Sequence, residues 1–278
     1  MTDQPLDDDA PIGRVLTRRE VLAIFGATGA AAFLAACTPS GSSSPGAPTS
    51  ATGGTSTAGS TPSSAASSAL PSASGAAAIP SCIVRPELTE GPYFVDEMLE
   101  RSDIRSDPSD GTLREGVPLS LAFAVSRLEG STCEPLEGAL VDVWHCDALG
   151  AYSDVTDRSS DTTGQKWLRG YQLTDAAGAA AFTTIYPGWY QGRTVHIHFK
   201  IRTDAGADSG LEFTSQLFFD DAVSDQVFAL EPYAQEGERS IRNEGDNIFG
   251  ESGGDLTLQL SGDPQSGYAT TFEIGVQV

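Results

Sequence analysis

The stretch TVHIHFKIRT, residues 194 to 203, alternates apolar and polar side chains over its whole length. Successive side chains of a β-strand point to opposite faces, so this alternation predicts a strand with one apolar face. The side chains expected to face a core are Val195, Ile197, Phe199 and Ile201. The opposite face carries His196 and His198, two of only three histidines in the 278-residue chain.

Similar short segments, rich in β-branched or aromatic residues and separated by turn signals, follow one another through the C-terminal region. A hairpin is predicted at 170–188, around a turn at 175–178 where Gly178 supplies a positive φ. A short helix is predicted at 220–230. Further strands are predicted at 117–128, 138–146, 214–221, 255–262 and 268–278. The expected fold class is all-β, a β-sandwich with few short helices.

Residues 1–37 have the features of an export signal. Arg18 and Arg19 form a twin-arginine pattern, and the uncharged apolar run that follows ends in Leu-Ala-Ala-Cys at Cys37, which resembles a bacterial lipobox. An ordinary secretory signal with an incidental arginine pair is the alternative. We expect an extracytoplasmic protein, exported by the twin-arginine route and attached to a membrane only through lipid on Cys37.

Residues 38–80 contain no Asp, Glu, Lys or Arg and consist mostly of Ser, Ala, Gly, Thr and Pro. Such a segment buries too little apolar surface to offset its chain entropy, so it is predicted to be a disordered tether. Residues 81–278 remain, which is enough for one domain with its own core. The formal net charge of −22 argues against nucleic acid as a partner, because nucleic acids bind basic surfaces.

The chain has four cysteines. If Cys37 carries lipid, three remain for a compartment in which disulfides form. A disulfide between Cys82 and Cys133 is predicted, because Cys146 lies at the end of a strand that is expected to be buried. No two cysteines have Cys-x-x-Cys spacing, which argues against a zinc–thiolate site.

His196 and His198 are expected to lie about 6.6 Å apart along the strand, which lets both imidazoles reach one metal ion. A His-x-His pair is as often two half-exposed side chains, so the pair alone leaves both readings open. A three-histidine zinc site would need His145, which lies upstream in another strand. A site of two histidines and one carboxylate usually places the acid beside one histidine, but Ile197 stands between them.

Two tyrosines complete a different ligand set. Tyr190 closes the loop before the histidine strand, and Tyr152 follows the strand that contains Trp144. A highly charged cation can remove the phenol proton, and the resulting anionic oxygen suits a ferric ion. Two phenolates and one hydroxide would make Fe(III) formally neutral, so the ion could sit in a buried cleft. The predicted cofactor is non-haem Fe(III), bound by Tyr152, Tyr190, His196 and His198.

Five motifs occur in a fixed order along the domain: TEGPYF (89–94), GALVDVWHCDALGAYSD (138–154), RGYQLTDAAGAAAFTTIYPGWY (169–190), GRTVHIHFK (192–200) and TSQLFFDD (214–221). Together they resemble the intradiol ring-cleavage dioxygenases, non-haem ferric enzymes that open catechols between their two hydroxyl groups. The resemblance covers about residues 89–219. It implies the same β-sandwich core and the same reaction, with a small aromatic diol and O2 as substrates and a muconate-type dicarboxylic acid as product.

The resemblance also implies roles for single residues. Tyr190 would be the ligand that substrate displaces, and it would then act as a base. Arg193 matches the family's active-site arginine, Gln216 matches a glutamine near the reacting ring, and Tyr93 would line the substrate pocket. The short loop from Tyr190 to His196 is similar to that of the secreted branch of the family, which leaves the identity of the diol and homo-oligomerisation open.

Two other functions remain to be weighed. One is a non-catalytic, tethered, prealbumin-like sandwich that binds a glycan or a protein, since the hairpin motif also occurs in such modules. The other is a zinc or copper enzyme that uses the same histidines and adds a carboxylate such as Asp154. An iron assay on the purified protein separates both from the ferric enzyme.

Overall fold

The computed structural model describes residues 83–129, 132–157, 161–203 and 210–277. The predicted export signal, the tether, Cys37 and Cys82 therefore lie outside the described residues, and those expectations stay predictions. In the described ranges, no helix is both long enough and apolar enough to cross a membrane.

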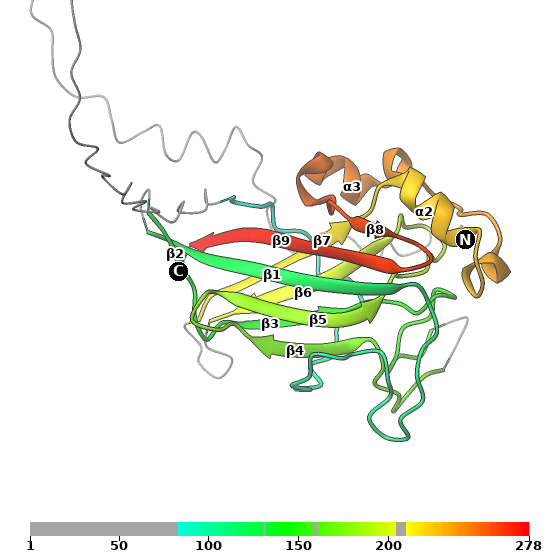
Figure 1. Ribbon diagram of the computed structural model, residues 1–278, viewed down its shortest axis with the longest axis horizontal. Helices are drawn as coiled ribbons and strands as arrows, with labels where there is room; N and C mark the ends of the chain where they lie inside the picture. The colour runs from blue at the N-terminus through cyan, green and yellow to red at the C-terminus, as the bar shows by residue number, and fades with distance from the viewer. Residues whose placement is uncertain (1–82, 130–131, 158–160, 204–209, 278) are drawn as a thin grey trace, which may run out of the picture. The chain divides into compact units, whose positions relative to one another are not determined.

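Two β-sheets pack face to face (Figure 1). The first, called the β1 sheet, has the order β2 (Thr132–Pro135), β1 (Pro118–Glu129), β9 (Gly267–Gln277), β8 (Ser261–Asp263), with β5 (Ala179–Ile185) also paired to β1. The second, called the β6 sheet, has the order β4 (Arg169–Leu173), β3 (Leu140–Trp144), β6 (His196–Arg202), β7 (Glu212–Phe218).

Short helices fill the segment between β7 and β8, and Figure 1 shows them gathered at one end of the sheets. In chain order they are α2 (Asp221–Phe228), the 3-10 turns η1 (Tyr233–Glu236) and η2 (Asn243–Gly245), α3 (Asn247–Ser252) and η3 (Gly253–Leu256). The side chain of Asp220 caps α2 by accepting from the backbone N–H groups of Ala222 and Val223. The predicted all-β sandwich with few short helices is confirmed.

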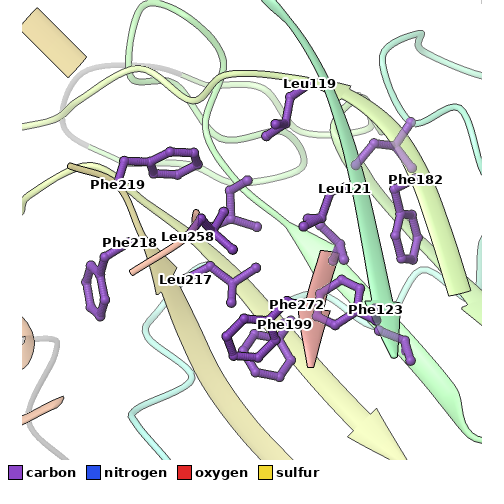
Figure 2. Close-up of a cluster of buried hydrophobic side chains, with 14 of the residues drawn as sticks. Leu119, Leu121, Phe123, Phe182, Phe199, Leu217, Phe218, Phe219, Leu258 and Phe272 are labelled. Carbon is purple, nitrogen blue, oxygen red and sulfur yellow. The ribbon is translucent and has the colours of Figure 1, made fainter. Parts of the chain in front are cut away.

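Aromatic side chains from both sheets meet in the core (Figure 2). The ring of Phe199 on β6 lies 5.3 Å from that of Phe123 on β1 and 5.5 Å from that of Phe272 on β9, measured between centroids. All three rings are buried, and such pairs add about 0.5–1.5 kcal/mol each beyond their buried area. Because Phe199 is fixed in the core, its neighbours His196 and His198 must point away from it.

The outer face of the β6 sheet is covered as well. Residues 83–100, called the N-terminal arm, cross it and are tied to β7 by the backbone hydrogen bond from Leu88 N to Thr214 O (3.0 Å). Lys200 is only 3% exposed, and its Nζ donates to the carboxylates of Glu90 in the arm and Glu212 on β7. The histidine face of β6 is therefore a covered, water-poor surface.

The hairpin predicted at 170–188 is wrong. The tight turn exists, with Gly178 at φ +74° and its N–H donating to Asp175 O (2.8 Å). However, β4 pairs with β3 and β5 pairs with β1, so the turn carries the chain from one sheet to the other. Thr174 N donates to Ala139 O (2.8 Å) and Thr174 Oγ1 accepts from Ala139 N (2.8 Å), which holds the end of β4 beside the residue that precedes β3.

The strand predicted at 255–262 is also wrong over most of its length. The 3-10 turn η3 takes up its first residues, and only its last two belong to β8. Leu256 and Leu258 are buried in the core, so the alternation of leucines reflects burial, while Thr257 forms only an isolated bridge with Phe218. The strands predicted at 117–128, 138–146, 194–203, 214–221 and 268–278 and the helix at 220–230 are confirmed to within a few residues.

Candidate metal centre

The two imidazoles on β6 converge. The Nε2 atoms of His196 and His198 lie 3.0 Å apart, and both residues are at most 2% exposed. The Nδ1–H of His196 donates to Thr194 O (2.7 Å), which leaves the lone pair of the neutral ring on Nε2. Burial lowers the pKa of both histidines well below the usual value, so both imidazoles are neutral at pH 7 and each can offer a lone pair to a metal.

The two predicted tyrosines lie beside these nitrogens. The Tyr190 hydroxyl is 3.1 Å from His196 Nε2, and the ring of Tyr152 is 5.7 Å from that of Tyr190 and 6.3 Å from that of His198. The Tyr152 hydroxyl is buried and meets no hydrogen-bonding partner of normal geometry among the described residues. Burial, followed by the neighbouring Tyr190, raises the pKa of Tyr152 well above its ordinary value, so its ionisation needs a nearby cation.

This donor set fits one ferric ion. Two donors bound about 2.1 Å from an ion at right angles lie about 3 Å apart, which matches the spacing of His196 Nε2 from His198 Nε2 and from the Tyr190 hydroxyl. Two phenolates would offset most of a trivalent charge in a buried site. Within the described part of the chain, no group of three or more His, Cys, Asp or Glu side chains could hold a metal.

Gly150 brings the two tyrosine loops together. It lies at φ +78°, and a Cβ on this residue would lie 2.3 Å from the backbone oxygen of Trp189, the neighbour of Tyr190. Asp147 shapes the same loop, because its Oδ1 accepts from the N–H groups of Leu149 and Ala151 (both 3.0 Å). The loop that carries Tyr152 is thus built to contact the loop that carries Tyr190.

Arg193 and Gln216, which the sequence predicted to be catalytic, contact each other beside the ligand strand. Arg193 is 5% exposed and Gln216 is fully buried, and Arg193 Nη2 donates to Gln216 Oε1 (2.6 Å). Gln216 Nε2 in turn donates to Thr89 O in the N-terminal arm (3.0 Å). The positive charge of Arg193 opposes the burial that raises the pKa of Tyr152, so its field reaches the donor set.

Tyr93 covers the donor set from the arm. Its ring stacks on that of Tyr152, with centroids 4.4 Å apart and an interplanar angle of 22°, and it meets the ring of Tyr190 edge-on at 6.1 Å. Sequence reasoning missed two further neighbours, Trp144, which stacks on His198, and Thr194. Thr194 could have been found, because it stands only two residues before His196, where its backbone carbonyl is within reach of the imidazole. No local signal pairs Trp144 with His198.

The third histidine takes no part in this set. The Nδ1–H of His145 donates to Cys146 O (2.7 Å), and its Nε2 accepts from Thr184 Oγ1 (2.7 Å) on the other sheet. The described residues therefore form no three-histidine site. Cys146 is a free, buried thiol and Cys133 is disulfide-bonded; because Cys82 lies outside the described residues, the Cys82–Cys133 pairing stays a prediction.

A family model described as Dioxygenase matches residues 89–244. Chlorocatechol 1,2-dioxygenase from Pseudomonas sp. (strain P51) is 29% identical over 154 residues, which is 49% of this chain and 55% of that relative. The protocatechuate 3,4-dioxygenase beta chain of Burkholderia cepacia is 28% identical over 146 residues, which is 49% of this chain and 60% of that relative. The chain thus spans less than two thirds of the length of these curated relatives.

A solved structure gives a wider match. The intradiol ring-cleavage dioxygenase from Tetranychus urticae superposes with a TM-score of 0.61 and 31% sequence identity, covering 70% of this chain and 95% of the other. The family model covers more than half of the chain, and its span includes all four predicted ligands. From the motifs, the sandwich and these matches together, the chain belongs to the intradiol ring-cleavage dioxygenase family.

Proposed function

We propose that this protein cleaves the ring of a catechol-type diol between its hydroxyl-bearing carbons with O2, giving a muconate-type dicarboxylic acid. The observation that carries the proposal is the convergence of four donor side chains. His196 Nε2 lies 3.1 Å from the Tyr190 hydroxyl and 3.0 Å from His198 Nε2, and the buried Tyr152 hydroxyl belongs to the same cluster of rings. The names of similar proteins, which include chlorocatechol and protocatechuate dioxygenases, support an aromatic diol as the substrate class.

Tyr152, Tyr190, His196 and His198 are the residues that would hold Fe(III). When bound, the ferric ion would supply Lewis acidity, which lowers the pKa of the diol and draws electron density from its ring. The chain's own groups orient the diol, accept its protons and stabilise the charge that develops on it.

The two tyrosines differ in exposure, which supports different roles. Tyr152 is 2% exposed and lies under the ring of Tyr93, so it would remain a ligand throughout the reaction. Tyr190 is only half-buried, and its oxygen can therefore meet an entering diol. A phenolate at Tyr190 Oη can accept the proton that one diol hydroxyl loses on binding.

Arg193 would stabilise negative charge on the bound ring. Its guanidinium is a buried cation beside the donor set, where low polarity makes a fixed charge act strongly on a developing anion. Gln216 accepts from Arg193 and is itself tied to the arm, so the guanidinium is held before substrate arrives. The aromatic ring of Tyr93 offers a flat surface for a planar substrate.

The proposal is tested by oxygen uptake with catechol, protocatechuate, hydroxyquinol and a chlorocatechol, with metal content and visible spectrum measured on the same sample. We expect about one iron per chain, a phenolate-to-ferric absorption band and consumption of about one O2 per diol. Protein without iron or oxygen uptake would favour the non-catalytic sandwich that binds a glycan or a protein. Stoichiometric zinc or copper would favour the other metalloenzyme.

A pair of tyrosine variants tests the ligand set directly. Tyr152→Phe removes one phenolate and is expected to weaken the visible band greatly. Tyr268→Phe is the matched control, since it removes a buried phenol from β9, in the other sheet. A band that is unchanged in Tyr152→Phe would contradict the role of Tyr152 as a ligand.

We also propose that the chain is exported and held at a membrane by lipid on Cys37. The twin-arginine pattern at Arg18 and Arg19 and the Leu-Ala-Ala-Cys ending support this. Labelling cells with a fatty acid is expected to mark the native protein and not Cys37→Ser, and the variant should leave the membrane fraction. Label retained on the variant would contradict the anchor.

A further inference from the structure

Asp246 is a buried carboxylate that follows the residues matched by the family model. Its Oδ2 accepts from Arg193 Nε (2.9 Å) and from Thr194 N (2.8 Å). The side chains of Arg193 and Asp246 are 6% and 1% exposed, respectively. The contact is therefore a desolvated, charge-assisted hydrogen bond, which is stronger and more directional than an ion pair at the surface.

The segment that supplies Asp246 also holds the neighbouring backbone. Asp246 Oδ1 accepts from Phe249 N (2.9 Å) in the first turn of α3, and Asn243 Oδ1 accepts from Thr194 Oγ1 (2.6 Å). Phe249 of α3 meets Phe218 edge-on, with centroids 5.2 Å apart, so α3 lies beside the end of β7, the strand that carries Gln216 (Figure 1). One short segment thus binds the side chain of Arg193 and both the backbone and the hydroxyl of Thr194.

These bonds continue into the proposed active site. Arg193 donates through Nε to Asp246 and through Nη2 to Gln216, and two bonds in different directions fix the plane of a guanidinium. Gln216 Nε2 in turn donates a hydrogen bond to Thr89 O in the arm. Thr194, whose N–H is bound by Asp246, accepts the Nδ1–H of His196 at its carbonyl oxygen.

We propose that Asp246 is a positioning residue for ring cleavage, which holds the guanidinium of Arg193 in the orientation that the reaction needs. This inference rests on the proposed function. Asp246 makes its side-chain hydrogen bonds to Arg193, Thr194 and Phe249 and to none of the proposed iron ligands. Its effect on the reaction must therefore pass through Arg193, with a smaller part through Thr194. Without the carboxylate, a buried guanidinium turns toward water or another acceptor.

The contact can be tested in metal-free protein by the NMR signal of the Arg193 Nε–H, assigned by its loss in Arg193→Lys. We expect this proton to exchange slowly with water in the native protein and rapidly in Asp246→Asn. Asp246→Ser is a second variant, because its hydroxyl can still accept from Phe249 N and so keep α3 capped. Asp225→Asn is the matched control: it makes the same charge change at an exposed carboxylate that binds Arg239 and Arg242.

The functional test uses the iron-loaded enzyme and catechol. Asp246→Asn is expected to lower kcat/KM about 10-fold or more, as for loss of a hydrogen bond to a charged group, while iron content and the visible band stay near native. Asp225→Asn should match the native enzyme. Asp246→Glu keeps a carboxylate and is expected to retain more activity than Asp246→Asn. In an Arg193→Gln background, Asp246→Asn should lower kcat/KM by less than about 2-fold, because the guanidinium that Asp246 holds is already absent.

Several results would overturn the inference. One is a kcat/KM in Asp246→Asn equal to that of the native enzyme, and another is a loss of kcat/KM from Asp246→Asn that is equally large in the native and Arg193→Gln backgrounds. Lower activity in Asp246→Glu than in Asp246→Asn would also contradict it. So would an Arg193 Nε–H that exchanges slowly in both Asp246→Asn and Asp246→Ser. A native protein that cleaves no diol would instead reject the proposed function. The NMR comparison separates the two failures, because it needs neither iron nor substrate.

Discussion

The indole ring of Trp144 lies parallel to the imidazole of His198, with centroids 5.0 Å apart and planes 8° apart. The two residues are direct cross-strand partners on β3 and β6. Metal-binding histidines usually donate their second N–H to an acceptor, but His198 Nδ1 has no hydrogen-bond partner among the described residues. Stacking on Trp144 is therefore what fixes the orientation of this proposed ligand.

Removing the stack should weaken iron binding. Aromatic pairs contribute about 0.5–1.5 kcal/mol beyond burial, so Trp144→Leu is expected to bind iron roughly 2- to 10-fold more weakly than Trp144→Phe, which keeps a ring. The measurement is iron titration of metal-free protein against a competing chelator. Equal affinities in the two variants would show that the stack does not position His198.

Adding one methyl group at Gly150 should separate the two tyrosine loops. A Cβ there would lie 2.3 Å from Trp189 O, at a φ of +78°. Gly150→Ala is expected to lose both iron and the visible band. Gly111→Ala is the matched control, since Gly111 has a φ of +76° and nothing within 4 Å of the added Cβ. Its unfolding free energy should fall by only roughly 1–2 kcal/mol, which is what alanine loses in a left-handed backbone conformation. Thermal unfolding and iron content separate the two effects.

His145 should make the metal-free protein less stable in acid. Burial lowers the pKa of His145 to about 4, whereas the unfolded chain titrates near 6.5. As the pH falls from 6.5 toward 4, the unfolded state gains a proton that the folded state does not bind, so stability decreases. His145→Asn removes this proton uptake. The difference in unfolding free energy between native and variant protein should shrink by about 3 kcal/mol from pH 7 to pH 4.

Denaturant unfolding at a series of pH values checks the histidine prediction. His196 and His198 also have lowered pKa values, but both proteins contain them, so their contribution cancels in the difference. Parallel stability curves for the native protein and His145→Asn would contradict the prediction.

Lys200 should hold the N-terminal arm over the site. Its Nζ lies 4.3 Å from the centre of the Phe94 ring and binds the carboxylates of Glu90 and Glu212. Both acids are more than a third exposed, so the ion pairs add little, and the whole cluster contributes about 1–2 kcal/mol. Lys200→Met is expected to speed hydrogen exchange at Leu88 N–H, which binds Thr214, about 5- to 30-fold.

The control for Lys200 is Lys166→Met. Lys166 also pairs with an arm residue, Glu97, but its side chain is 38% exposed, so its removal should change exchange much less. Because Tyr93 belongs to the arm, Lys200→Met should also raise the KM for the diol. Equal exchange rates in the two lysine variants would contradict a special role for the buried one.

Local alternation predicted much of the fold. Ile197 and Phe199 face the core and His196 and His198 face away, as expected, because side-chain direction in a strand depends only on the position along it. The same alternation at Leu256 and Leu258 predicted a strand, but the structure has buried side chains there and no strand. Strand pairing by backbone hydrogen bonds also needs a partner strand in register, which alternation does not reveal. The turn at Asp175 was recognised, but the local sequence does not say whether the strands that flank it share a sheet.

The four proposed ligands could be named from residue types and spacing, whereas the residues that contact and support them could not. Tyr152 and Tyr190 stand out because they lie at the ends of predicted strands near the two histidines, and because an anionic phenolate oxygen suits a ferric ion. Asp246 is about fifty positions away from Arg193, and only the packing of α3 against the end of the β6 sheet brings them into contact. Lys200 shares the polar face of the histidine strand, and it is buried because the arm covers that face.

The pairing of β1 with β9 has a consequence for how the domain assembles. Leu119 pairs in parallel with Tyr268, more than half of the chain's length away, so the β1 sheet closes through one of the most distant contacts in the molecule. All strands of the β6 sheet come from residues 140–218, so its paired strands, such as β3 and β6 at Trp144 and His198, are much nearer in sequence than β1 and β9. Contacts between nearby segments form faster than distant ones. We therefore expect the segments that carry the four proposed iron ligands to come together before β9 pairs with β1 and completes the other sheet.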